Sequence, residues 1–124
     1  MGFPSPARGY EGKRISLDQQ FIHHPSATFF MRAGTTYWRA GIMSGALLII
    51  DRSLKPVHGS IVTCALGGQF VLRRLRLTPH AYLENIDEPG VIEQLPGGDD
   101  DDTVFGVVAY VVNDTRAGEF DSSP

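Results

Sequence analysis

The chain has 124 residues, of which 42% are hydrophobic, and a formal net charge of −3 at pH 7. This length and apolar content suit one domain with a single core. The acidic balance argues against a protein that coats nucleic acid, because such proteins present a basic surface. The single cysteine, Cys64, excludes an internal disulfide and a cysteine-based zinc site, and it is typical of a reducing compartment.

The start of the chain and its apolar runs bear on location. No run approaches the roughly 20 apolar residues of a membrane span, and the first residues lack the core of a signal peptide. We therefore expect a cytoplasmic protein with no membrane contact. Residues 1–14 contain prolines and glycines without any helix or strand period, which predicts a flexible N-terminal arm.

One short helix is expected after this arm. Ser16 and Gln19 have the spacing of a capping box, and Leu17 and Phe21, four residues apart, would share one helix face. The helix should end before Pro25, because the residue that precedes a proline disfavours helical geometry.

Strands are expected over most of the remaining chain. Runs rich in Val, Ile, Leu, Phe and Tyr cover residues 27–33, 46–52, 60–66, 69–77, 80–85 and 103–112. Gly67-Gly68 separates two of these runs and predicts a two-residue hairpin turn. No helical period long enough for a crossover between parallel strands is present. The predicted fold is therefore mainly β, an antiparallel domain over residues 15–113 with one short N-terminal helix and a frayed C-terminal tail, residues 114–124.

A pair of hydroxyl side chains lies between two apolar runs. Thr35 and Thr36 follow Gly34, and a hydroxyl on a tight turn beside a strand is a common position for the nucleophile of a hydrolase. From this stretch alone, a nucleophile and the former position of one are both open interpretations.

Arg73 has apolar neighbours within the expected strand 69–77. Period-two alternation places it on the same face as Val71 and Leu75. It is either a snorkelling or ion-paired arginine at a sheet margin, which the spacing favours, or the position of a former base beside a hydroxyl. The arginines that follow make a basic run, but no aromatic residues alternate with them, so that nucleic-acid binding is only weakly indicated.

The histidines offer little support for a metal site. His23, His24, His58 and His80 are scattered over expected turns without the spacing of a metal-ligand pair. We predict no metal and no cofactor.

Several motifs, taken in their order and spacing, resemble those of one family. They are Gly2-Phe-Pro-Ser-Pro-Ala7, His24-Pro-Ser-Ala-Thr28, Leu47-Leu-Ile-Ile-Asp51, His58-Gly-Ser-Ile-Val62, Phe70-Val-Leu-Arg-Arg-Leu75 and Val104-Phe-Gly-Val-Val108. This pattern over residues 2–113 resembles the UmuD family of LexA-like S24 serine peptidases, to which phage repressor C-terminal domains also belong. The resemblance implies a compact, mostly β domain of the LexA C-terminal type that forms homodimers and serves SOS mutagenesis.

The resemblance also implies positions for the family's serine–lysine dyad. It carries the serine of a Gly-Asp-Ser-Met turn onto Thr36, with Thr35 as the alternative because one residue is missing before Gly34, and it carries the lysine onto Arg73. Desolvation lowers the pKa of a dyad lysine until it accepts the hydroxyl proton, whereas arginine stays protonated in proteins. We therefore expect a pseudo-peptidase, with an active self-cleaving peptidase that uses Thr36 as the alternative.

The same resemblance implies a set of partners. Family members cleave themselves, stimulated by the RecA filament, just before the Gly-Phe-Pro-Ser-Pro stretch, so Met1 and Gly2 are expected to mark the remnant of that cleavage site. The implied role is that of an accessory subunit for translesion DNA synthesis, as a homodimer or a heterodimer with UmuD, which binds a UmuC-type polymerase and RecA. No sequence-specific DNA binding is expected. A repressor-like dimerisation or regulatory module, including an inhibitor of a host UmuD, is a further alternative.

The apolar run 104–112 is the expected dimer interface. We expect it to form a strand at an exposed sheet edge, which a symmetric partner would cover. The expected contact residues are Val104, Phe105, Val107, Val108 and Tyr110.

Overall fold

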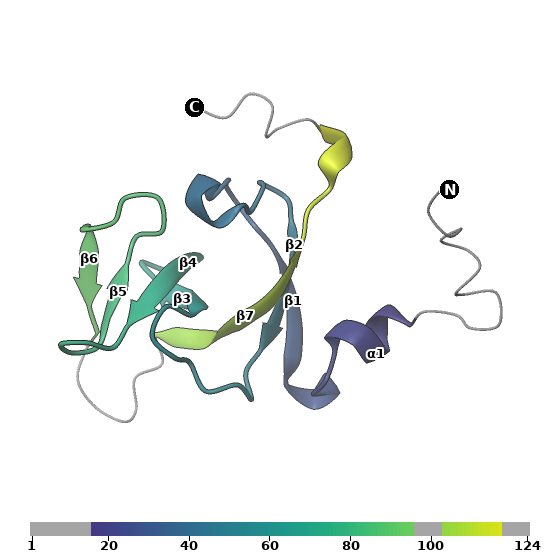
Figure 1. Cartoon of the computed structure of the whole chain (residues 1–124), viewed down its shortest axis with the longest axis horizontal. Coiled ribbons are helices and arrows are strands. Elements are labelled where there is room, and N and C mark those ends of the chain that lie inside the picture. Colours follow the sequence, from purple (N-terminus) through teal and green to yellow (C-terminus); the bar gives the residue numbers. More distant parts are fainter. Residues whose placement is uncertain (1–15, 96–102, 118–124) are drawn as a thin grey trace, which may run out of the picture.

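An antiparallel sheet of seven strands forms the body of the protein (Figure 1). The computed structural model describes residues 16–95 and 103–117. The strands are β1 (Thr28–Arg32), β2 (Leu47–Asp51), β3 (Ile61–Leu66), β4 (Gln69–Arg76), β5 (Tyr82–Glu84), β6 (Ile92–Gln94) and β7 (Val104–Val112). They lie side by side in the order β1-β2-β7-β3-β4-β5-β6. The prediction of a mainly β, antiparallel fold with one short helix is confirmed.

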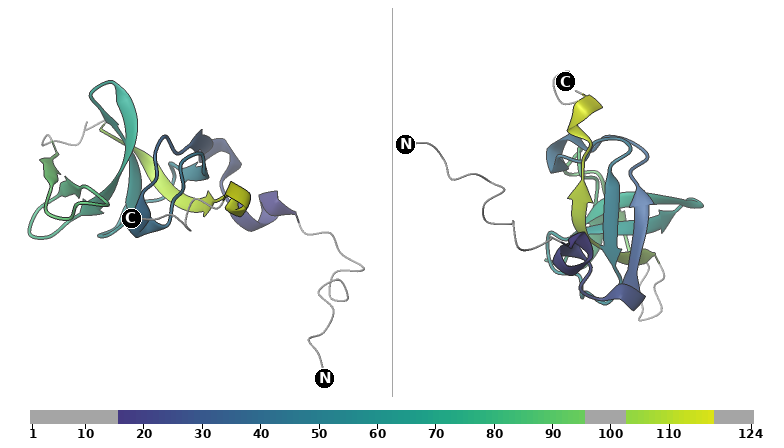
Figure 2. Two further views of the ribbon diagram at one scale, coloured as in Figure 1. Left: turned by 90° about the horizontal axis from the view of Figure 1, so that it is seen from above. Right: turned by 90° about the vertical axis from the view of Figure 1, so that its right-hand side faces the viewer.

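The sheet curls instead of lying flat. In the views of Figures 1 and 2, β5 and β6 lie at one end of the molecule, β1 and the helix α1 (Leu17–Phe21) lie at the other, and β7 runs between them. Two buried clusters fill the faces of this curled sheet. The first contains Ala33, Ile42, Ala46, Leu48, Ile50, Leu72 and Ile86, and the second contains Val62, Cys64, Leu75 and Leu83.

The helix α1 begins and ends where its sequence predicts. The side chain of Ser16 accepts a hydrogen bond from the amide of Gln19 at 3.3 Å, which caps the first turn. Pro25 begins a short 3-10 turn, η2 (Pro25–Ala27), soon after the helix ends. The ring of Phe21 meets the ring of Tyr110 on β7 edge to face, with centroids 4.9 Å apart, so this contact docks the helix on the sheet.

The hairpin between β3 and β4 is also confirmed. The two strands pair from Ile61↔Arg74 to Leu66↔Gln69. Gly67 and Gly68 connect them with φ angles of +57° and +79°. Positive φ at both central residues is what a tight primed hairpin turn requires, and glycine adopts it without strain.

The strand β6 was not expected from the sequence. It has three residues, of which Ile92 is exposed, so no buried apolar face marks it. Pairing with β5, from Glu84↔Ile92 to Tyr82↔Gln94, is what extends this segment into a strand. A strand held by pairing alone leaves no periodic signal in its own sequence.

The expected position of β7 at a sheet edge is wrong for the first half of the strand. Val104 to Val107 pair with β3, while Val107 to Val112 pair with β2, so β7 lies inside the sheet. The pairing with β3 stops at Val107. Over Val108–Val112, the described residues contain no strand on that side of β7.

Several expectations fall at the ends of the chain. The expected frayed tail is structured where it is described, because η4 (Thr115–Ala117) follows β7 and Arg116 pairs with Asp114 at 2.8 Å. The predicted arm, with Met1 and Gly2, and residues 118–124 lie outside the described residues. Within residues 16–95 and 103–117, no helix has the length and apolar character needed to cross a membrane.

Candidate functional site

Both threonines of the expected nucleophile position lie in the connection between β1 and β2, residues 33–46, here called the β1–β2 loop. Its base extends the ladder of these strands, since Ala33 donates to the carbonyl of Ala46 at 2.9 Å. Further out, Tyr37 and Ile42 exchange backbone hydrogen bonds of 2.8 and 3.2 Å around the turn η3 (Trp38–Ala40). The loop is therefore internally hydrogen-bonded.

Thr36 is one of the residues that hold this loop together. Its Oγ1 accepts a hydrogen bond from the backbone amide of Ser44, across the loop, at 2.9 Å. Thr36 is half-buried, whereas Thr35 is exposed. The hydroxyl at the expected nucleophile position thus has a structural partner.

Two side chains from distant elements fix the outside of the loop. The carboxylate of Asp87, beyond β5, accepts from the amides of Trp38 and Arg39 at 3.2 and 2.9 Å. The amide side chain of Asn113, just after β7, accepts from Met43 at 2.9 Å and donates to Gly41 at 2.8 Å. Sequence reasoning missed both residues, because a polar side chain in a turn is unremarkable until the fold brings the loop beside it.

Arg73 is held by a carboxylate and by its own strand. Its Nε donates to Oε1 of Glu93 on β6 at 2.9 Å, and its Nη1 donates to the carbonyl of Leu72 at 2.9 Å. The side chain of Arg73 is 19% exposed and that of Glu93 is 41% exposed. This is the ion-paired arginine at a sheet margin that the spacing favoured.

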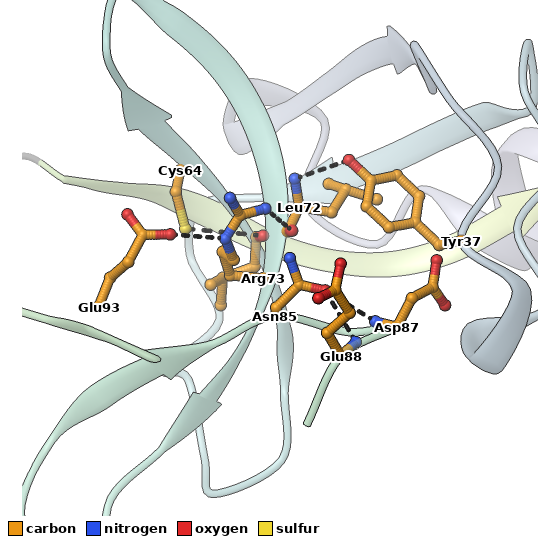
Figure 3. A network of polar contacts seen from close by, with 9 residues as sticks. Tyr37, Cys64, Leu72, Arg73, Asn85, Asp87, Glu88 and Glu93 are labelled. Atoms are coloured by element: carbon orange, nitrogen blue, oxygen red, sulfur yellow. Dashed lines mark hydrogen bonds and ion pairs between the residues drawn. The ribbon is translucent and has the colours of Figure 1, made fainter. Parts of the chain in front are cut away.

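The β1–β2 loop and the side chain of Arg73 both hydrogen-bond to the backbone of Leu72 on β4. Oη of Tyr37, the residue after Thr36, accepts a hydrogen bond from the amide of Leu72 at 3.2 Å. Figure 3 shows Tyr37 on one side of Leu72 and the guanidinium of Arg73 reaching Glu93 on the other. The strand β5 pairs with β4 only from Arg74 to Arg76 and does not reach Leu72. The side chains of Tyr37 and Arg73 therefore supply the hydrogen bonds to the amide and the carbonyl of Leu72.

This arrangement restricts the chemistry available at Thr36 and Arg73, the expected dyad positions. A guanidinium has only donors and keeps its charge at any pH that a protein survives, so Arg73 cannot remove a proton from Thr36. Lys55 lies exposed in the turn after β2, outside the β1–β2 loop and β4. The expected dyad positions therefore hold a loop hydroxyl, Thr36, and on β4 a fixed positive charge, Arg73.

A second polar cluster was missed by the sequence analysis. The buried carboxylate of Asp51, at the end of β2, accepts from Nδ1 of His24 at 2.7 Å, from the amide of Ser53 at 2.8 Å and from the Ser53 hydroxyl. Burial alone raises the pKa of Asp51, but the hydrogen bonds from Ser53 and His24 outweigh it and hold that pKa below its ordinary value. The available signal was an acidic residue that ends an apolar strand.

Arg74, Arg76 and the four histidines contact other parts of the fold. Arg74 donates to the carbonyl of Gly59 at 2.8 Å, and Arg76 pairs with Glu84 at 3.0 Å, so the basic run of β4 is used within the domain. Each histidine contacts a different element: His23 meets Tyr110, His24 meets Asp51, His58 meets the amide of Leu77 and His80 meets Gln94. In the described part of the chain, no group of three or more His, Cys, Asp or Glu residues is placed to hold a metal ion.

An apolar groove lies on the opposite side of the molecule from the β5–β6 hairpin. Its volume is about 530 Å³, and α1, β1, β2 and β7 contribute its walls. Leu17, Phe21, Phe30, Ile49, Val111 and Val112 are among the lining residues. Leu17, Phe30 and Val112 are 67%, 55% and 49% exposed, so the groove presents apolar surface to the outside.

The curled antiparallel sheet, with its internally hydrogen-bonded β1–β2 loop beside β4, belongs to the class of LexA-like peptidase domains. The family model described as Peptidase S24-like matches residues 1–109, and the chain belongs to this family, as its motifs predicted. Protein ImpA of Salmonella typhimurium is 41% identical over 117 residues, which cover 93% of this chain and 79% of that protein. Protein SamA of Salmonella typhimurium strain LT2 is 37% identical over 117 residues, which cover 94% of this chain and 81% of that protein. Protein MucA of Escherichia coli is 36% identical over 110 residues, which cover 88% of this chain and 75% of that protein.

Proposed function

We propose that this protein is a non-catalytic, UmuD-like accessory subunit for SOS-induced translesion DNA synthesis and mutagenesis. Membership of the S24 family and the similarity to ImpA, SamA and MucA over most of the chain support this family role. One observation carries the non-catalytic part: Arg73, onto which the resemblance carries the family's base, has its guanidinium paired with Glu93. A group in that state accepts no proton from a nucleophile.

The test of lost catalysis is a cleavage assay in trans. The unaltered protein and its variants are incubated with a cleavable UmuD-type substrate whose own active site is blocked, and the products are weighed by mass spectrometry. We expect no cleavage by the unaltered protein, even at high pH, because raising the pH does not turn arginine into a base. Cleavage by the unaltered protein would overturn the proposal and favour a peptidase that uses Thr36.

The structure indicates which combination of substitutions should restore cleavage. Thr36→Ser with Arg73→Lys places a serine–lysine pair at the dyad positions, but Glu93 would then face the new ammonium group. A nearby carboxylate favours the charged form of lysine and raises its pKa, which works against its use as a base. Adding Glu93→Gln removes this effect, so we expect the triple variant to cleave faster than the double variant. Thr36→Ser alone, the matched control, stays inactive.

We propose that the protein acts as a homodimer, or as a heterodimer with a UmuD. Val108–Val112 of β7 has β2 on one side and, within the described residues, no strand on the other, so its backbone is open to a symmetric partner. The exposed apolar groove adjoins this half of the strand, because Val111 and Val112 line it. The proposed contact therefore moves from the first half of β7, where Val104, Phe105 and Val107 lie beside β3, towards Val108, Tyr110 and the residues that follow.

A charge placed on this surface tests the dimer. Val112→Lys should shift sedimentation at micromolar concentration towards monomer, since the lysine would be buried without a partner at the interface. Val91→Lys is the matched control, because Val91 is 52% exposed against 49% for Val112 and lies at the distant β5–β6 end. A monomeric unaltered protein, or equal effects of the two variants, would count against this interface.

We propose that the dimer binds a UmuC-type polymerase and the RecA filament. The support is the family resemblance, together with a basic run that is used within the fold and leaves DNA contact to the partners. Co-purification with a UmuC-type polymerase and co-sedimentation with RecA filaments test the two partners separately. We expect both with the unaltered protein and reduced polymerase binding with Val112→Lys; retention of neither partner would favour the repressor-like regulatory module.

A further inference from the structure

A buried hydroxyl on β3 lacks a hydrogen-bond partner within the described structure. Thr63 is 1% exposed, and its Oγ1 is a buried side-chain atom without a partner in the described residues. Its neighbours Val62 and Cys64 pack into the second buried cluster, so alternation turns Thr63 towards the opposite face of β3. Buried hydroxyls are almost always hydrogen-bonded in folded proteins, so this atom requires an explanation.

The face to which Thr63 turns contains a small cavity beside the β1–β2 loop. Its volume is about 30 Å³, and Thr63 and Tyr37 both line it. The other lining residues include Met31, Ala33, Gly34, Leu48, Phe70 and Leu72. A cavity needs roughly 10–15 Å³ of such space to hold one water molecule, so this one has room for a water but not for an organic ligand.

Tyr37 is the second hydroxyl-bearing residue that lines this cavity. Its Oη accepts the amide hydrogen of Leu72 at 3.2 Å, and the hydroxyl still has its own proton to donate. Thr63 faces Leu72 across the β3–β4 pair, which places both hydroxyls near one residue of β4. Arg32 also lines the cavity, but its Nη1 donates to the carbonyl of Gly45 at 3.2 Å.

We propose that this cavity binds one internal water molecule that links the hydroxyls of Thr63 and Tyr37. The water accepts a hydrogen bond from the Tyr37 hydroxyl and forms a second one with Oγ1 of Thr63, which satisfies both groups. It thereby ties the β1–β2 loop, next to Thr36, to β3 as well as to β4. This inference concerns the packing of the loop and is independent of the proposed loss of catalysis.

Water contacts in solution test the site directly. Nuclear Overhauser transfer from water to the Thr63 methyl group and the Leu72 amide is expected in the unaltered protein. Thr63→Val keeps the shape of the side chain but removes the hydroxyl, so the transfer at Leu72 should be lost, whereas Thr63→Ser keeps the hydroxyl and should retain it. Absence of water transfer in the unaltered protein would overturn the proposal.

Urea unfolding supplies a second readout. If a water links the two hydroxyls, Thr63→Val and Tyr37→Phe each lower the midpoint, and the double variant falls by less than the sum of the two shifts, because both changes disrupt the same bridge. If the Thr63 hydroxyl is simply unpaired, Thr63→Val raises the midpoint, because a buried unsatisfied group is removed, and the two shifts add. The second pattern would refute the bridging water.

Discussion

Two polar clusters lie at different places on the same sheet, and they differ in how their residues relate to the family motifs. At the first, His24 and Asp51 belong to the stretches that resemble the family, and the buried carboxylate of Asp51 accepts hydrogen bonds from the more exposed His24 and Ser53. At the second are Thr36 and Arg73, onto which the resemblance carries the family's serine and lysine, and both side chains are hydrogen-bonded within the loop or to a neighbouring strand. From this difference we expect the fold to depend more on the first cluster than on the second.

The largest expected effect is at the first cluster. Asp51→Asn should lower the free energy of unfolding by about 2–3 kcal/mol, because hydrogen bonds to a buried charged group are the strong ones and the neutral amide accepts them less well. Urea unfolding at neutral pH measures it. Asp114→Asn, at an exposed carboxylate, is the control and should leave the midpoint unchanged. Equal midpoints for Asp51→Asn and the unaltered protein would break the comparison.

Acid should weaken the same cluster. The pKa of Asp51 in the folded protein lies below its ordinary value, so the unfolded chain takes up this proton more readily than the folded one. The stability that the carboxylate contributes is fully present above a pH of about 4, near its unfolded pKa, and is lost as the pH falls through the folded pKa. Unfolding free energies measured across this range should fall less steeply for Asp51→Asn. Parallel curves would show that Asp51 does not carry this dependence.

A smaller effect is expected where the β1–β2 loop contacts β4. Tyr37→Phe removes the acceptor of the Leu72 amide and should cost about 1 kcal/mol. Hydrogen exchange of the Leu72 amide should accelerate, while that of Leu75, which donates to Ser60 in the ladder with β3, should not. Unchanged protection at Leu72 would mean that this hydrogen bond does not hold the loop.

The smallest effect is expected at the ion pair of Arg73 with Glu93. Arg73→Met together with Glu93→Gln removes a partly exposed ion pair, and the stability should change by no more than about 1 kcal/mol. Thermal unfolding of this double variant, with Arg76→Met and Glu84→Gln as a second pair for comparison, measures it. A loss as large as that of Asp51→Asn would show that the Arg73 cluster also supports the fold, which would remove the contrast between the two regions.

Local features of the sequence determined much of this protein. The cap at Ser16, the Gly67-Gly68 hairpin and the apolar runs of the longer strands all depend on interactions between near neighbours, so their signals are present in the chain itself. The family motifs then indicated Thr36 and Arg73 as the positions of interest. That arginine cannot act as a base also follows from residue identity alone.

The tertiary structure alone decided the partners of these residues. Glu93 lies on a strand without a periodic pattern, and Asp87 and Asn113 reach the β1–β2 loop from segments far along the chain. The position of β7 between β2 and β3 likewise follows from the strand order, and an apolar run does not indicate which strands will be its neighbours. Such contacts join residues that are distant in sequence, and no local pattern records which strand edges will meet. The sequence by itself therefore determined most of the elements and that residue 73 is an arginine, and the fold decided which groups hold Thr36 and Arg73 in place.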